Sequence, residues 1–280
     1  MKSYLTVLFI LNIFSGLSVF PQTQPLIEKW DLKGEVKSII EYQFHEKLFS
    51  ENDFIKGDTL CAGGKYFFDE KKRLVREETC FEEIKFEMDY KYDEYGFLSG
   101  EYNFGRLIVQ YIYDDVGNRI KELFYDKEEL IGHWKYLYDD KGHTIQRAKY
   151  YGKDLDVKWE MECNADGKVI KELKINREND RSIDEMVVYK YDDKGNQVYA
   201  QISNPETGES VIRRYTYNQW NDITKWESKS DYNELSYSHT SIIHYTYDTF
   251  GNWIEKVEYF LLPDTDRSRA IIFERTIEYY

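Results

Sequence analysis

The stretch that most constrains the fold is an eight-residue motif, Tyr189 to Asn196, because variants of it return about every 25 residues. The copies align on an Asp or Asn that opens a turn, and one hairpin alone cannot bury an apolar face, so such units must stack. The chain is therefore predicted to be a stack of β-hairpins. The eight openers are Asp69, Asp93, Asp114, Asp139, Asn164, Asp192, Asn218 and Asp248.

The residue three positions after each opener indicates a tight turn. An Asp or Asn side chain can accept a hydrogen bond from the backbone two residues further on, and glycine tolerates the positive φ that closes such a turn. Asn221 is the best substitute for glycine there, and Lys72 is a poor one. The predicted turn glycines are Gly96, Gly117, Gly142, Gly167, Gly195 and Gly251.

An aromatic pair separated by one residue precedes almost every turn. Residues two apart share one face of a strand, so the rings are expected to form a ladder on the concave, better-buried side of the sheet. The intervening residues are mixed in character, as on a solvated face. The pairs are Tyr66 and Phe68, Tyr90 and Tyr92, Tyr111 and Tyr113, Tyr136 and Tyr138, Tyr189 and Tyr191, Tyr215 and Tyr217, and Tyr245 and Tyr247.

These patterns predict an all-β chain with a single domain over residues 30–280. Eight hairpins extended at both ends give about 16 to 18 antiparallel strands. A sheet this wide should curl, so we expect an open, superhelical up-and-down meander. Residues 34–44 alternate as a first strand does, and the charged residues 46–60 are expected to form a loop before the repeats.

The motif Tyr-x-Tyr-Asp-x-x-Gly-Asn, at residues 111–118, 189–196 and 245–252, resembles the YD repeat of the Rhs (rearrangement hot spot) family. The resemblance covers roughly residues 65–255. It implies a curled β-sheet, which in Rhs and teneurin-like proteins often forms a shell around a toxin. We expect this chain to be too short to close a large shell, with no toxin domain after the repeats. An accessory or remnant of a toxin-delivery system is therefore one functional alternative.

The N-terminus has the pattern of an export signal. Lys2 precedes an apolar run from Leu5 to Phe14, and small residues near Gly16 to Ser18 fit signal-peptidase cleavage. We expect residues 1–18 to be a signal peptide and 19–29 a flexible lead-in, since the run is short for a membrane anchor. The chain would then be periplasmic, secreted or at the cell surface, with no integral span after cleavage. Its net charge of -14 disfavours nucleic acid as a partner.

Few residues suggest chemistry. Direct pairing across the first turn would place Cys61 opposite Cys80, and an exported chain permits a disulfide, although two buried thiols remain an alternative. Cys163 stands at an aromatic position and is interpreted as a small apolar filler. The turn acids recur in every copy, whereas a catalytic pair should be singular. We therefore predict no catalytic, metal or cofactor residues and no enzyme.

The tryptophans admit a binding role. Their rings could stack against sugars or a protein partner, although aromatic residues at strand period usually pack the sheet itself. Charge on both faces of residues 119–122 argues against a lipid-embedded barrel. The sequence thus predicts a non-enzymatic exported binding or scaffold module of the bacterial envelope, with carbohydrate binding as an alternative. The candidate stacking residues are Trp134, Trp159, Trp220, Trp226 and Trp253.

Overall fold

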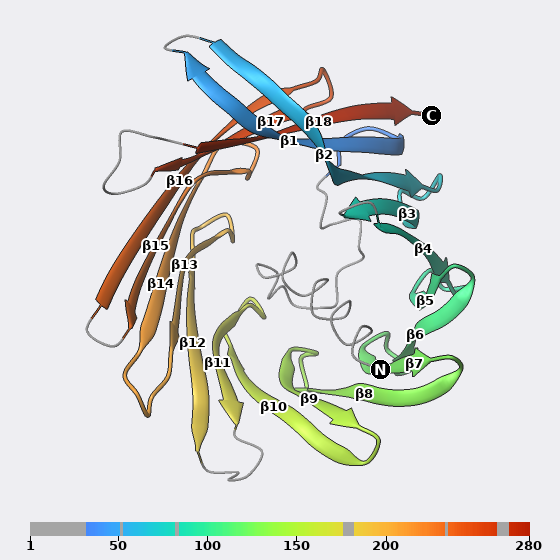
Figure 1. The fold of residues 1–280 in the computed structure, drawn as a ribbon. Coiled ribbons are helices and arrows are strands. Elements are labelled where there is room, and N and C mark those ends of the chain that lie inside the picture. Colours follow the sequence, from blue (N-terminus) through green and yellow to red (C-terminus); the bar gives the residue numbers. More distant parts are fainter. Residues whose placement is uncertain (1–31, 51–52, 82–83, 176–181, 233–234, 262–268) are drawn as a thin grey trace.

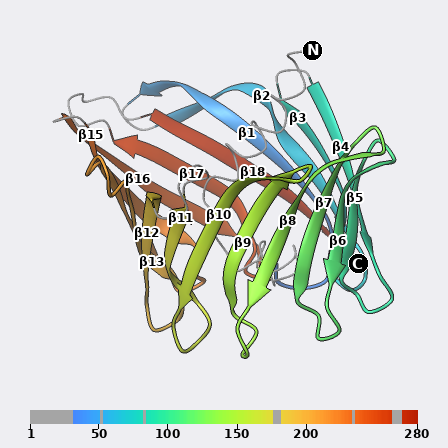
Figure 2. The same ribbon diagram turned by 90° about the horizontal axis from the view of Figure 1, so that it is seen from below.

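The part of the chain that the structure describes forms a closed antiparallel β-barrel of 18 strands, in which each strand pairs with its neighbours in the sequence. Figure 1 looks into the barrel, with the colours following the sequence around the wall, and Figure 2 shows the strands side by side. This computed structural model describes residues 32–50, 53–81, 84–175, 182–232, 235–261 and 269–280. The predicted signal peptide and lead-in lie outside the described residues. Over the described part of the chain, no helix is long and apolar enough to cross a bilayer.

The strands are mostly six to ten residues long, and those at the two ends of the chain are longer. Their bounds are β1 Val36–Ser50, β2 Asp53–Phe68, β3 Leu74–Phe81, β4 Ile84–Tyr92, β5 Leu98–Asn103, β6 Arg106–Tyr113, β7 Arg119–Asp126, β8 Glu129–Tyr138, β9 Thr144–Tyr151, β10 Asp154–Cys163, β11 Val169–Ile175, β12 Ile183–Tyr191, β13 Gln197–Ser203, β14 Ser210–Tyr217, β15 Ile223–Tyr232, β16 Leu235–Tyr247, β17 Trp253–Leu261 and β18 Arg269–Tyr279.

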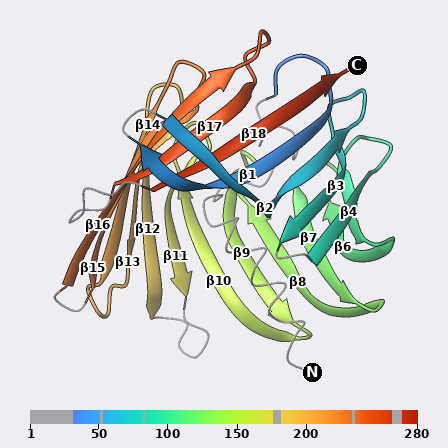
Figure 3. The same ribbon diagram turned by 45° about the horizontal axis from the view of Figure 1, so that its top comes forward.

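Closure of the barrel overturns the expected open superhelical sheet. The first and last strands pair directly, with Ile39 opposite Ile277, so β18 lies beside β1 (Figure 3). The seam is reinforced at one rim, where the backbone N–H of Tyr280 donates to the Glu35 carbonyl at 3.0 Å. Closure satisfies the backbone groups of two strands that would otherwise be sheet edges. The predicted loop at 46–60 was also wrong, because β1 and β2 run through most of it.

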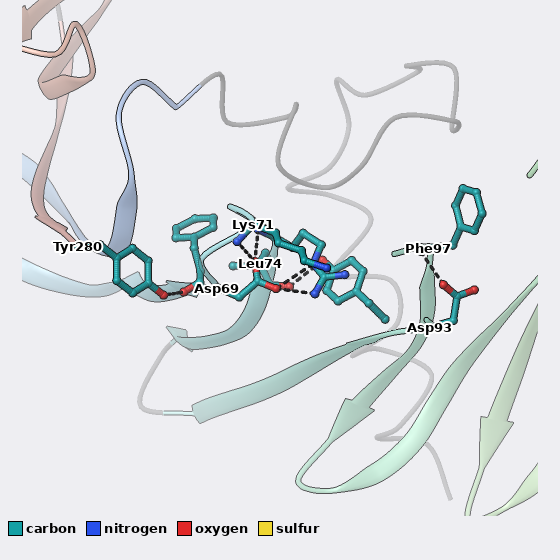
Figure 4. Close-up of polar contacts among 9 residues, drawn as sticks. Asp69, Lys71, Leu74, Asp93, Phe97 and Tyr280 are labelled. Carbon is teal, nitrogen blue, oxygen red and sulfur yellow. Dashed lines mark hydrogen bonds and ion pairs between the residues drawn. The ribbon is translucent and has the colours of Figure 1, made fainter. Parts of the chain in front are cut away.

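All eight turns share one geometry. The opener's N–H donates to the carbonyl four residues on, and its carbonyl accepts the N–H three residues on. Its side-chain Oδ1 also accepts two backbone N–H groups, as Asp69 does from Lys71 and Arg73 at 2.9 and 2.8 Å (Figure 4). The third residue after the opener has positive φ in every turn, including Lys72 at 60° and Asn221 at 67°.

A β-bulge follows each turn and gives the tyrosines a partner. After the second turn, Lys91 pairs with Gly100 and Tyr92 with Leu98, so Ser99 is skipped. The carbonyl just before the bulged residue then accepts the phenol of the next copy. Tyr92 donates in this way to Leu74 at 2.8 Å. The same bond joins Tyr113 to Leu98, Tyr138 to Arg119, Tyr191 to Val169 and Tyr217 to Gln197.

The two faces of the wall differ in burial. The aromatic face is the buried one, as Tyr90, Tyr136, Tyr189 and Tyr215 show, whereas the residues between paired aromatics, such as Lys190, are mostly exposed. Side chains on the concave side of a closed sheet converge and bury one another. We therefore assign the aromatic face to the inner wall of the barrel.

Candidate functional site

One position of the repeat lies on the inner wall and changes chemistry from copy to copy. It is the eighth residue after each opener, and it pairs with the first aromatic position of its own hairpin, as Glu101 does with Tyr90. We call this row the inner belt. Its members in chain order are Glu77, Glu101, Glu122, Arg147, Glu172, Ala200, Trp226 and Lys256.

Tyrosines of the next hairpin satisfy the belt carboxylates. Tyr136 donates to Glu122 at 2.8 Å, and Glu122 is only 8% exposed. Tyr111 donates to Glu101 in the same manner. Tyr90 and Tyr189 lie in the equivalent places beside Glu77 and Glu172. Buried carboxylates are tolerated only when they are hydrogen-bonded. These tyrosine–glutamate pairs therefore link each hairpin to the next.

Burial also alters the protonation of the belt. It raises the pKa of Glu101 to about 7, although the Tyr111 hydrogen bond favours the ionised form and opposes the shift. Burial likewise raises the pKa of Glu172, which is 2% exposed, against the opposing charge of Arg147. Near neutral pH the Glu101 carboxyl of the belt is therefore partly protonated.

Arg119 and Arg147 lie beside these acids and differ in the strength of their hydrogen bonds. Arg119 donates to Glu122 at 2.8 Å and lies 4.4 Å over the Tyr111 ring. Arg147 reaches Glu172 only at 3.4 Å. The Nε atoms of both arginines are buried without a hydrogen-bond partner. Arg147 is thus the less satisfied of the two.

A second charged cluster lies near the closing seam. Arg275 donates to Glu41 at 2.8 Å and stacks 3.3 Å from the Trp253 ring centre. Lys256 lies 3.7 Å from the centre of the Phe273 ring, and burial lowers the pKa of its ammonium group. The positive charges of this cluster face aromatic rings at cation–π distance.

The structure divides the five candidate tryptophans into groups. Trp134 and Trp159 flank Arg147 on the inner wall, with its guanidinium carbon 5.8 and 5.1 Å from their ring centres. Trp226 and Trp253 lie in or beside the second cluster, where Trp226 donates to Glu258 at 2.9 Å. Trp220 lies on the turn rim instead, in tilted contact with the Tyr247 ring and 41% exposed.

The register contradicts the reasoning behind the predicted disulfide. Cys80 pairs with Gly63, because the turn adds one residue to the expected loop and the bulge at Val75 adds another. Cys61 is therefore not directly opposite Cys80. The side chains of both cysteines lie outside the described residues. Cys163 has a free thiol whose Sγ contacts the Thr144 carbonyl at 3.6 Å, where other copies use a phenol.

The turn residues have structural partners. The carboxylates of Asp93, Asp114, Asp139, Asp192 and Asp248 each accept backbone N–H groups of their own turn, and Gly96, Gly117, Gly142, Gly195 and Gly251 have positive φ. Within the described ranges, no group of three or more His, Cys, Asp or Glu is arranged to hold a metal ion.

Sequence reasoning missed the inner belt. The signal was present, because extending the alignment five residues beyond the turn glycine shows a column in which four copies carry Glu and one carries Arg. The bulge after each turn decides on which face of the sheet this position lies, and the sequence does not show the bulge. The belt became recognisable only once the register was known.

Comparisons with known proteins place the chain in no established family. No family model and no curated protein matches it. Among solved structures, a porin-like protein from Bacteroides uniformis aligns with a TM-score of 0.45 and 11% identity, covering 88% of this chain and 98% of that one. A porin-like protein from Bacteroides vulgatus has the same coverage, a TM-score of 0.32 and 9% identity. Similarity at this level carries no argument about function.

Proposed function

We propose that the chain is a non-enzymatic, exported barrel that acts as a binding or scaffold module of a bacterial envelope and takes its ligand on the inner wall. The observation that carries this proposal is the inner belt with its flanking aromatic rings. A barrel of about 18 strands is too wide for its own side chains to fill. The residues of the wall that keep exposed surface, such as the half-buried Trp134 and Trp159, remain available to a ligand.

The outer wall supports a water-facing barrel. Charged pairs point outward from mid-strand, such as Lys158 with Glu160 and Lys225 with Glu227, both at 2.8 Å. A lipid-facing barrel wall carries a continuous apolar band, and an Arg or Lys at the bilayer midplane costs roughly 2–4 kcal/mol. The outer wall of this chain is therefore suited to water.

The belt carboxylates favour a binding role over catalysis. Glu122 accepts the Tyr136 phenol and Glu101 the Tyr111 phenol, each from the next hairpin, so the arrangement recurs along the barrel. A glycosidase requires one acid and one base in unique surroundings. Recurrence makes these carboxylates part of the wall.

The test is a ligand screen followed by lysine footprinting. The purified mature chain is applied to glycan and peptide arrays, and the best ligand is then added before acetylation and mass spectrometry. The inner-wall residues Lys149 and Lys174 should be protected by the ligand, whereas the outer residues Lys91 and Lys190 should react as before. Protection of the outer lysines alone, or a folded chain without any array ligand, would refute the proposal.

A carbohydrate is the ligand class that the aromatic residues favour. Trp134 and Trp159 are only half buried, and indole faces stack on the apolar faces of sugar rings. Arg147, which lies between the two indoles, adds a positive charge to this carbohydrate-binding surface.

A further inference from the structure

The repeat departs from its pattern most strongly at β8, β9 and β10. The belt residue there is Arg147 instead of Glu, and the flanking strands place Trp134 and Trp159 on its two sides. In the other copies, the position of these two tryptophans holds Gly64, Met88, Val109, Val187, Arg213 or Ile243. Lys256 also reverses the belt charge, but only Arg147 has tryptophans at this repeat position on both of its flanking strands.

Two further cations face the same region of the inner wall. Lys149 pairs with Trp134 across strands, and Lys174 pairs with Trp159, so their side chains share the face of the indoles. Neither lysine forms an ion pair with another described residue: Lys149 lies over the Tyr151 ring and Lys174 over the Trp159 ring. Positive charge therefore gathers here in a chain of net charge -14.

The nearby acids neutralise this charge only in part. Glu172 contacts Arg147 at 3.4 Å, and Glu185 is the cross-strand partner of Lys174. Glu122, on β7, is already bonded to Arg119 and Tyr136. The three cations of this region therefore face two acids, Glu172 and Glu185. The local charge balance leaves one positive charge that an anionic ligand could neutralise.

The contrast with Arg119 identifies Arg147 as the under-used group. Arg119 has a full-strength bond to Glu122, so its role is to hold the wall together. Arg147 has only a long contact, although its side chain is mostly buried, and its Nε, like that of Arg119, has no partner. An arginine fork that is held between two indoles and short of acceptors is suited to a carboxylate.

We propose that Trp134, Arg147 and Trp159 form a subsite for a uronic-acid-containing oligosaccharide on the inner wall of the barrel. The indoles stack on the sugar rings, and Arg147 binds the carboxylate, assisted by Lys149 and Lys174. The two indole centres lie no more than about 11 Å apart, because Arg147 is within 5.8 and 5.1 Å of them. A disaccharide spans such a distance. This inference rests on the proposed function.

The experiment measures binding of trigalacturonate and of a neutral galactose trisaccharide to the full mature chain by calorimetry. The wild-type chain should bind the acidic sugar at least tenfold more tightly than the neutral one. Arg147→Met should weaken the acidic sugar at least tenfold, the equivalent of about 1.4 kcal/mol. The same substitution should leave the neutral sugar within about twofold.

The matched control is Lys158→Met, which removes a cation from the outer face of β10, next to Trp159 in sequence; its affinity for the acidic sugar should equal that of the wild type. Trp159→Leu, a second inner-wall variant, should weaken both sugars. Circular dichroism and the melting temperature verify that each variant is folded.

The outcomes separate the two proposals. Binding of neutral sugars alone, or unchanged affinity in folded Arg147→Met, overturns the uronate subsite and leaves the binding module intact. If the folded wild-type chain binds neither trisaccharide, the subsite proposal is wrong. The proposal of a binding module is refuted only if the arrays also find no ligand.

Discussion

Replacing Glu101 by glutamine should make the barrel more stable at alkaline pH. Burial raises the pKa of this carboxyl from 4.5 to about 7, so the folded chain keeps the proton over a range in which the unfolded chain has lost it. Between about pH 4.5 and 7 the folded state therefore binds more protons, and wild-type stability falls as pH rises through this window. Glutamine removes the titration and can still accept the Tyr111 phenol.

The magnitude follows from the shift. A difference of 2.5 units corresponds to roughly 3 kcal/mol at 1.36 kcal/mol per unit. Glu101 retains some exposed surface, so solvent screening lowers the expected value to about 2 kcal/mol. At pH 8 the variant should exceed the wild type by that amount, or by roughly 4–8 °C in melting temperature. At pH 5 most of this difference should be absent, because pH 5 lies near the lower end of the window.

The assay is urea unfolding followed by tryptophan fluorescence and circular dichroism at pH 5 and pH 8. Glu172 contributes a pH dependence of the same sign, so the difference between variant and wild type isolates Glu101. Glu162→Gln, on the exposed outer face, serves as the control and should follow the wild-type profile. A difference between Glu101→Gln and wild type that is the same at both pH values would refute the reasoning.

Three further predictions concern the turns, the phenol bonds and the seam. Lys72→Gly should stabilise the barrel by roughly 0.5–1 kcal/mol in urea unfolding, since a lysine at positive φ is strained, and Asn221→Gly should change little; a destabilised Lys72→Gly would contradict this. Tyr191→Phe should lose about 1 kcal/mol with its 2.8 Å bond to a backbone carbonyl, and an unchanged unfolding midpoint would argue against that role. With the three native cysteines replaced by serine, Ser38→Cys combined with Glu278→Cys should oxidise to an intramolecular disulfide on a non-reducing gel, because the two residues are partners across the seam; an open sheet would give no such monomeric cross-link.

Local chemistry explains what could be predicted. The turn openers and the residues at positive φ are fixed within a few residues of chain, so the hairpins and the number of strands could be inferred. The pairing of Ile39 with Ile277 joins positions far apart in sequence and leaves no local signal. Closure was therefore missed, although both end segments alternate as strands do.

The register explains the remaining errors. A bulge such as the one at Val75 shifts every later pair by one residue, and the sequence contains no sign of it that differs from an ordinary strand residue. The predicted facing of Cys61 and Cys80 failed for this reason. The inner belt depends on the same shift. An alignment of the repeats shows that this position varies, but it does not show that the position faces the inner wall.

The bond from Tyr280 to Glu35 has a consequence for how the barrel folds. The hydrogen-bonded strands form a closed ring, so no strand is an edge strand at which the sheet begins. Joining the two ends by a short linker and opening the chain at the exposed Phe104–Gly105 loop should give a circular permutant with the same wall. In the native order, closing the seam joins residues from the two ends of the chain: Lys37, for example, must meet Glu278 across 241 residues, and loop-closure entropy grows with that separation. The permutant makes that contact local, so it should fold through a different last step.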